Sequence, residues 1–395
     1  MPYIHEIPDW PNFTWNAQPL EKPLAEVRHR QGRLLGRMEA LGFDLQAEAT
    51  LRTLTADVVK SSAIEGENLN ADEVRSSIAR RLGIDVGGYI PVGRDVDGIV
   101  EMMLDATQNY QTPLTAERLF GWHAALFPTG RSGLHRIAVG AWRPLEAGPM
   151  QVVSGPFGRE RVHFEAPSAD RLDNEMRRFL DWFNQDQPLD PVLKAGLAHL
   201  WFVTIHPFED GNGRMARAIA DMALARADRT KNRFYSMSSQ IEAERRDYYD
   251  QLEAQQRGTL DITDWLTWFL ACLDRALARA DETLTVVTTK ARLWEIINRQ
   301  PVNERQRAII NRLIDGFQGN LTTSKYAKIT KSSSDTALRD IRGLLTWGIL
   351  VQNPGGGRST SYRLATVDEL ARIGDTRLRD REERVRASRA GEEDA

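Results

Sequence analysis

A stretch of twelve residues, His206 to Arg217, constrains this chain more than any other part of its sequence. An apolar run at 200–205 leads into it and an alanine-rich run to residue 225 leads out, and both have helical composition. The Gly-Asn-Gly between these runs lets the backbone adopt positive φ and turn successive N–H groups toward one point. A helix that begins just after such a turn adds the positive end of its dipole. The pattern therefore predicts an anion site, suited to phosphate, between two helices.

The polar side chains of this stretch predict the chemistry carried out on the bound phosphate. His206 is its one group that titrates near neutrality and is the natural general base. Asp210 is a hard oxygen ligand, placed to hold Mg²⁺. The phosphate-binding set is predicted to be the glycine turn and two arginines three residues apart on one helix face, namely Gly211, Asn212, Gly213, Arg214 and Arg217. Taken singly, each feature is usually a turn, a cap or a solvated side chain. Together they indicate the transfer of part of a nucleotide triphosphate.

The whole stretch matches the signature of the Fic (Fido) family, H-x-F-x-[DE]-G-N-G-R-x-x-R, at every defined position. This resemblance implies an all-α fold with a β-hairpin flap. It also implies an enzyme that moves AMP from ATP to a Ser, Thr or Tyr hydroxyl of a protein, which includes itself as a candidate target. Two alternatives stay open. Some relatives transfer UMP, phosphocholine or the γ-phosphate, or remove AMP, and a DNA-binding regulator would use the core as a sensor.

A second motif lies upstream, where a helix predicted over 46–64 ends. Ser61 and Glu65 are four residues apart and project from one face of that helix. A solvated acid is the alternative, although a carboxylate near a helix C-terminus is mildly unfavourable. The segment matches the inhibitory motif of regulated Fic proteins, [ST]-x-x-x-E-[GN]. This resemblance implies that Glu65 pairs with Arg217 in place of the γ-phosphate, within an N-terminal inhibitory domain over 1–95.

The remaining site residues are assigned by the same resemblance, over a Fic core at 96–284. Two β-prone runs at 150–153 and 161–164 surround turn residues and predict a hairpin. As the flap of a Fic protein, it would receive the target by strand addition along Met150, Gln151, Val152 and Val153. Tyr248 and Tyr249 resemble the region that encloses adenine, with core packing as the alternative use of at least one.

Hydrophobic spacing predicts the helices around these motifs. A Pro- and Trp-rich start is not expected to form a long helix, and a Gly-rich link is expected over 83–98. The last core helix is expected to end near Leu284. The predicted helices cover residues 24–41, 46–64, 71–81, 96–110, 170–184 and 191–205.

The composition changes in the C-terminal part, where 285–366 resembles a winged-helix domain. Twelve Lys and Arg stand against five Asp and Glu between residues 292 and 364. Arg339 and Arg342 fall on its second helix and Arg358 on its wing. Such a basic face binds DNA in the major groove, or serves as a protein-interaction or dimerisation element, and both remain open. A charged tail occupies 367–395.

Composition bounds the rest. With 395 residues the chain is long enough for two or three domains, and its net charge of −3 argues against nucleic acid or acidic membranes as partners of the whole protein. Its single cysteine, Cys272, excludes an intrachain disulfide and is compatible with a reducing compartment. No signal peptide and no membrane-length apolar run are visible. The sequence therefore predicts a soluble, cytoplasmic protein.

Overall fold

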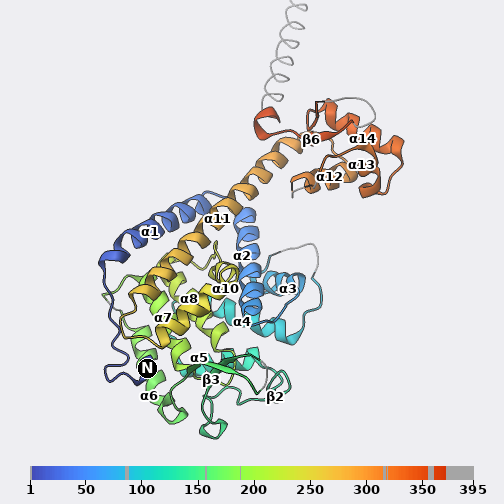
Figure 1. Ribbon diagram of the computed structural model, residues 1–395. Helices are drawn as coiled ribbons and strands as arrows, with labels where there is room; N and C mark the ends of the chain where they lie inside the picture. The colour runs from blue at the N-terminus through green and yellow to red at the C-terminus, as the bar shows by residue number, and fades with distance from the viewer. Residues whose placement is uncertain are drawn as a thin grey trace, which may run out of the picture. The chain divides into compact units, whose positions relative to one another are not determined.

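A computed structural model describes residues 2–84, 89–155, 158–186, 188–314, 317, 319–354 and 360–370. The chain divides into two compact units, 1–282 and 283–395. Both are mainly helical, and the described strands form three separate two-stranded antiparallel sheets (Figure 1). The all-α character expected from the sequence is confirmed.

The first unit contains most of the helices. They are α1 (Gln18–Glu39), α2 (Phe43–Ile64), α3 (Ala71–Leu82), α4 (Arg94–Gln108), α5 (Ala116–Leu126), α6 (Leu172–Asn184), α7 (Pro191–Ile205), α8 (Asn212–Asp228), α9 (Met237–Ala243) and α10 (Arg245–Gln256). The short elements are the 3₁₀ turns η1 (Ile4–Glu6), η2 (Leu145–Ala147) and η3 (Ala169–Arg171), and the strands β1 (Arg131–Ser132), β2 (His135–Arg136), β3 (Gln151–Ser154) and β4 (Arg161–Glu165).

The core of this unit is built on α7 and α8. Nearly every residue of α7 is buried, as expected for a helix that is apolar on all sides. It starts at a cap in which the Asp190 side chain accepts from the N–H of Val192, with Pro191 in the first turn, where its missing N–H costs nothing. α8 starts directly after Gly211, so the loop at 206–211 is fixed at both ends by buried helices.

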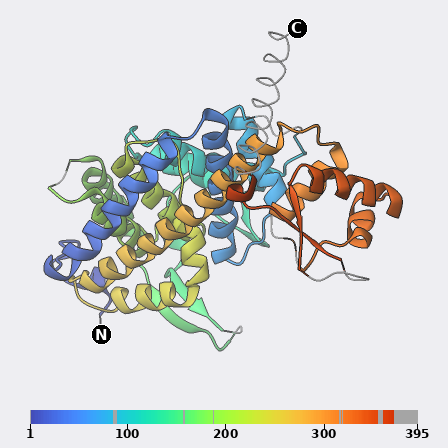
Figure 2. The same cartoon turned by 90° about the horizontal axis from the view of Figure 1, so that it is seen from above.

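Helix α1 begins earlier than the sequence predicted. It starts at Gln18 rather than near residue 24, because Pro19 lies in the first turn, where proline is compatible with a helix. Arginines of α1 bind acids of α11 (Thr263–Ile297), with 2.7 Å between Arg30 Nε and Asp274 Oδ1, and 2.7 Å between Arg33 Nη2 and Asp281 Oδ2. The two helices consequently lie side by side (Figures 1 and 2).

The expected Gly-rich link at 83–98 is wrong at its C-terminal end. Gly93 is the N-cap of α4, and Gly98 lies inside that helix. A Cβ at position 98 would lie 1.8 Å from the carbonyl oxygen of Ala125 on α5. Glycine is therefore present for close helix packing rather than for a loop.

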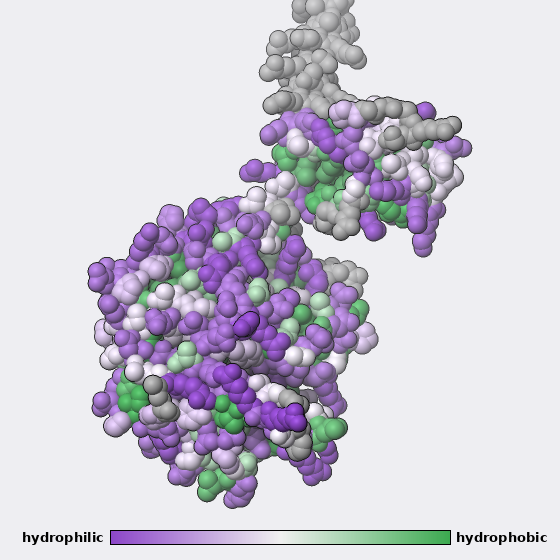
Figure 3. Space-filling view, in the orientation of Figure 1, coloured by the Kyte–Doolittle hydropathy of each residue, from purple (hydrophilic) through white to green (hydrophobic). Residues whose placement is uncertain are grey.

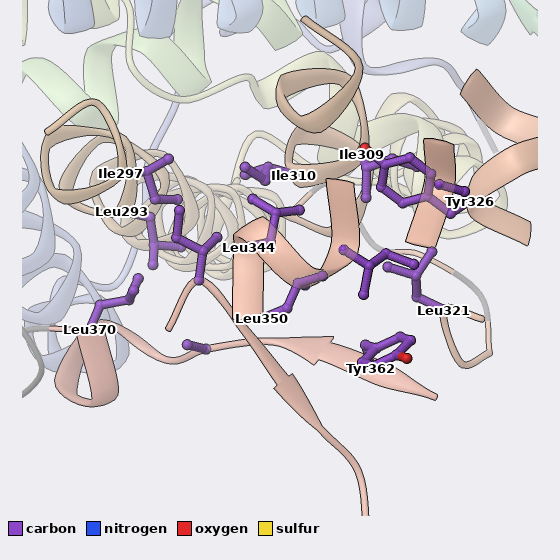
Figure 4. Packing of buried hydrophobic residues seen from close by; sticks show 14 residues of the cluster. Leu293, Ile297, Ile309, Ile310, Leu321, Tyr326, Leu344, Leu350, Tyr362 and Leu370 are labelled. Atoms are coloured by element: carbon purple, nitrogen blue, oxygen red, sulfur yellow. The ribbon is translucent and has the colours of Figure 1, made fainter. Parts of the chain in front are cut away.

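The second unit has its own hydrophobic core (Figure 4). Its helices are α12 (Glu304–Ile314), α13 (Thr323–Thr330) and α14 (Ser334–Thr346), followed by the paired strands β5 (Leu350–Gln352) and β6 (Tyr362–Leu364). Ala337, Ile341 and Leu344 bury one face of α14 in this core, and Arg339 and Arg342 are exposed. The expected hairpin follows α14, but Arg339 and Arg342 lie on the third helix of this unit rather than on its second, because α13 forms a separate helix that was not predicted from the sequence. The predicted wing residue Arg358 and tail residues 371–395 lie outside the described residues.

The last core helix does not end near Leu284. α11 continues to Ile297, and Leu293 and Ile297 belong to the core of the second unit.

The surface seen in Figure 3 is mostly hydrophilic on the first unit. Among the described residues, no helix has the length and apolar character needed to cross a membrane.

The packing of α4 on α5 predicts the effect of one methyl group. We expect Gly98→Ala to destabilise the first unit by about 1–3 kcal/mol, because the new Cβ overlaps the backbone carbonyl of Ala125, which cannot move without its helix. Gly32→Ala on α1 is the matched control. Its Cβ meets nothing within 4 Å, so alanine should stabilise the helix by about 0.5–1 kcal/mol. Thermal unfolding midpoints that fall equally, or rise in both variants, would contradict the close packing.

Candidate active site

Most of the predicted site residues line one cavity of about 680 Å³, whereas Ser61, Arg214 and Arg217 are not among its lining residues. Its walls come from the α7–α8 loop, from β3 and β4, from α10, and from Glu65 at the end of α2. The structure thus brings together segments that are far apart in the sequence. The site residues that line the cavity are His206, Asp210, Gly211, Asn212, Gly213, Met150, Gln151, Val152, Val153, Tyr248, Tyr249 and Glu65.

His206 is held in an orientation suited to a base. It caps α7 with φ of 52°, a left-handed conformation that is uncommon for a residue with a side chain. Its Nδ1–H donates to the carbonyl oxygen of Val203 at 3.0 Å, which leaves Nε2 as the acceptor. Burial lowers the pKa of His206 below 6.5, although the hydrogen bond to Val203 opposes the shift. This shift favours the neutral form of the ring.

Two side chains hold the loop that follows. Arg143 is buried, and its Nε donates to the carbonyl oxygen of His206 at 2.9 Å. Asn212 donates to the carbonyl oxygen of Phe208 at 2.8 Å and accepts from the N–H of Phe208 at 3.0 Å. The Asn212 side chain is thus committed to the loop. Phe208 is fully buried and stacks on His123, with ring centroids 4.2 Å apart.

The turn at the start of α8 has the geometry of an anion site. Gly211 adopts φ of 82°, and α8 begins at the next residue with its free N–H groups beside the cavity. Asp210 accepts from the N–H of Gly211 at 2.6 Å and from the hydroxyl of Ser132. No group of three metal-ligating acids, histidines or cysteines occurs among the described residues. A cation here would have Asp210 as its protein ligand, and Mg²⁺ commonly binds through one carboxylate together with substrate phosphates.

Both arginines of the motif are bound by the N-terminal part of the chain. Arg217 is only 2% exposed. Its Nε donates to Ser61 Oγ at 2.9 Å, and its Nη2 donates to the Ser61 carbonyl at 2.9 Å and to Glu65 Oε1 at 2.8 Å. Glu65 also lies against the turn, since a Cβ at Gly213 would come within 2.1 Å of Glu65 Oε1. The predicted pairing of Glu65 with Arg217 is present in the structure.

Arg214 has a partner that the sequence did not reveal. Its Nη1 donates to Glu67 Oε2 at 2.6 Å, and its guanidinium lies over the ring of Phe127. Burial raises the pKa of Glu67, and the positive charge of Arg214 acts in the opposite direction. Glu67 lies two residues beyond Glu65, on the segment that follows α2. Its nearness in sequence was the only signal that could have suggested this contact.

The two candidate adenine-pocket tyrosines differ. Tyr248 is 1% exposed, and its hydroxyl is hydrogen-bonded to His199 Nε2 at 2.9 Å, so most of the ring packs in the core. Tyr249 is 37% exposed, and its hydroxyl donates to the carbonyl of Ile64 at 3.2 Å. Both contribute to the cavity wall. Tyr249 also links α10 to the C-terminal end of α2.

Two family models match parts of this chain. A family model described as the Fic/DOC family matches residues 113–224, and one described as a domain of unknown function, DUF4172, matches residues 3–84. Residues 113–224 belong to the Fic/DOC family. The Fic domain thus contains the whole α7–α8 loop, both arginines and the flap hairpin.

Similar proteins include the protein adenylyltransferase Fic of Culex quinquefasciatus, 29% identical over 227 residues, or 56% of this chain and 40% of that protein. The protein adenylyltransferase Fic of Nematostella vectensis is 33% identical over 146 residues, or 36% of this chain and 31% of that protein. The chain therefore spans less than half the length of these relatives. A Fic family crystal structure from Desulfovibrio desulfuricans G20 covers 90% of this chain and 98% of its own, at 22% identity and a TM-score of 0.49.

Proposed function

We propose that this protein is an adenylyltransferase that transfers AMP from ATP to a Ser, Thr or Tyr hydroxyl of a protein. The observation that carries this proposal is the position of His206. Its acceptor nitrogen belongs to a ring fixed by Val203, on the same cavity as the amide turn at 211–213. The names of the similar proteins support the same activity.

The proposed reaction is a single displacement. His206 Nε2 accepts the hydroxyl proton of the target, and the hydroxyl oxygen attacks the α-phosphorus of ATP. The bond between the α-phosphorus and the oxygen bridging to the β-phosphorus breaks, and pyrophosphate leaves. Backbone N–H groups at the start of α8, with Arg214 and Arg217, would bind the phosphates and stabilise charge in the transition state. Mg²⁺ held by Asp210 would supply further neutralisation of phosphate charge when bound.

The N-terminal segment would inhibit this reaction. Glu65 and Glu67 each place a carboxylate on one of the arginines needed for the phosphates. A carboxylate resembles a phosphate in charge and in its ability to accept two hydrogen bonds from a guanidinium. ATP and the two glutamates would then compete for the same donors, so release of residues 65–67 would be required for a productive ATP position.

This competition predicts a graded activation. We expect Glu65→Gly to raise AMP transfer at least about tenfold, because loss of a charge-assisted contact to a buried guanidinium exceeds 1.4 kcal/mol. Glu67→Gln should raise it about two- to fivefold, since the Glu67 side chain is 47% exposed against 31% for Glu65. The measurement is incorporation of α-labelled ATP into protein. Glu39→Gln, an exposed acid on α1, is the control and should leave the rate unchanged.

The label also tests the proposed chemistry. AMP transfer retains an α-phosphate label on the target and releases a γ-phosphate label. Phosphate transfer would do the reverse, and UMP transfer would need UTP. The proposal would be supported if the Glu65→Gly protein incorporates label from α-labelled ATP and if the additional substitution His206→Ala abolishes this labelling. Absence of any labelled band, self-modification included, would overturn it.

The environment of His206 predicts a pH profile. A base is active when it is deprotonated, and burial lowers the pKa of His206 in the folded protein. The acid limb of kcat/KM for ATP, which reports the free enzyme, should therefore have its midpoint below pH 6.5 in the Glu65→Gly variant. Thermal unfolding over the same pH range separates this effect from acid denaturation. A midpoint above 6.5 in a fully folded protein would contradict the assignment of His206.

Binding of DNA by the second unit stays a prediction. Arg339 and Arg342 lie on the exposed face of α14. The same face suits an acidic protein surface equally well. A strong loss of affinity for duplex DNA with rising salt would distinguish DNA binding from a protein contact. Self-association and the cytoplasmic location also remain predictions.

A further inference from the structure

The flap hairpin presents two strand edges that differ sharply. An isolated two-stranded hairpin is only marginally stable in water, so β3 and β4 require support from the rest of the fold. Figure 2 shows this hairpin extending from the helices of the first unit. Among the described residues, the side chains of α10, Arg257 and the N-terminus that support the hairpin bind β4, and they determine which edge stays available.

Helix α10 and the residue that follows it bind β4 from one side. Arg257 donates from Nε to the carbonyl oxygen of His163 and from Nη2 to that of Val162, both at 2.8 Å. Glu253, one turn earlier, accepts from Arg161 Nη2 at 2.7 Å and from His163 Nδ1 at 2.6 Å. Two consecutive carbonyls and two side chains of β4 are therefore bound to one face of α10.

A β-bulge makes this arrangement possible. Val152 pairs with Phe164 and Val153 pairs with Val162, so His163 is an extra residue on β4. A bulge redirects a side chain and increases the local twist. With Nδ1–H donating to Glu253, His163 Nε2 accepts from the hydroxyl of Ser154 on β3 at 2.5 Å. The ring thus connects α10 to the last residue of β3.

The N-terminal residues cover the other end of β4. His5 Nε2–H donates to the carbonyl oxygen of Glu165 at 2.8 Å, and Tyr3 packs edge-on against the buried ring of Phe164, with centroids 5.2 Å apart. The Arg257 guanidinium also lies over the Tyr3 ring, 5.4 Å from its centroid. Backbone groups of β4 at residues 162, 163 and 165 are consequently occupied.

Strand β3 has no comparable cover. Among the described residues, the backbone of 151–154 has hydrogen bonds only to β4, and Val153 is 49% exposed. Residues 151–154 of β3 line the same cavity as His206. An extended peptide can pair with such an edge through its own backbone, and register on a strand fixes which side chain faces which way.

We propose that Arg257 is a positioning residue for the protein substrate, which holds β4 so that β3 alone accepts an extended segment of the target. This inference rests on the proposed AMP transfer. Arg257 itself does not line the cavity. Its guanidinium acts through the two hydrogen bonds that it donates to carbonyls of β4. Loss of these bonds would let the hairpin change its position relative to His206.

The test compares Arg257→Met, Arg257→Lys and Arg177→Met in the Glu65→Gly background, with an extended peptide substrate that carries one hydroxyl residue. Arg177 is an exposed arginine on α6 and serves as the charge-matched control. For Arg257→Met we expect KM for the peptide to rise roughly tenfold, the loss expected for charge-assisted hydrogen bonds, with the Kd for ATP unchanged. Arg257→Lys should recover only part of the lost affinity for the peptide. Its ammonium keeps the positive charge, but it lacks the planar pair of N–H groups with which arginine binds both carbonyls.

The outcomes separate this inference from the proposed function. If the Glu65→Gly protein transfers AMP and Arg257→Met keeps the parental KM for peptide, the positioning role is overturned and the transferase proposal stands. An equal rise in Kd for ATP and in KM for peptide would also overturn it, since a general structural defect would then explain both. If no variant transfers AMP, the proposed function itself fails. Thermal unfolding shows whether each variant is folded.

Discussion

The arrangement of this protein depends on one buried guanidinium. Arg217 is nearly inaccessible to solvent, and its Nη1 has no hydrogen-bond partner in the described structure. A buried charge is tolerated only with a counter-charge and hydrogen bonds, and removal of its partner carries a penalty of several kcal/mol. The site therefore requires an anion at all times. Glu65 supplies it from within the chain, and in the proposed function a phosphate group of ATP would replace it. The unused Nη1 donor shows that the carboxylate does not satisfy the guanidinium completely.

The same region stores conformational strain that the surrounding contacts must offset. A left-handed backbone at His206 is unfavourable for a residue with a side chain, yet Arg143, Asn212 and the buried Phe208 fix the loop on both sides. These residues act through backbone carbonyls and amides, so they control where the imidazole lies without touching the cavity centre. Rigid support of this kind is what a base needs when its effectiveness depends on sub-ångström placement.

Motifs that are contiguous in the sequence were enough to predict much of this site. Contacts between residues far apart in the chain could not be predicted in this way. The glycine turn, both arginines and His206 lie within twelve residues, so their spacing alone places them on one loop and one helix. Glu67 and Arg257 act on partners 147 and 95 residues away, with 2.6 and 2.8 Å contacts that no local pattern encodes. Gly98 shows the same limit, because the sequence alone does not distinguish a glycine that permits close helix packing from a glycine in a loop. Continuation of α11 past Leu284 was missed because two hydrophobic cores share one helix.

The N-terminal segment acts on both predicted substrate sites. Residues 3 and 5 brace the outer edge of β4, and residues 61–67 bind the two phosphate-site arginines. Both regions belong to the part of the chain before residue 84 that matches a separate family model. Displacement of residues 65–67 alone would open the nucleotide position and leave the flap braced, whereas loss of the whole segment would remove the brace as well. In the proposed function, release of inhibition would therefore have to be local: a movement confined to the end of α2 would leave the flap braced, and unfolding of the whole N-terminal region would not.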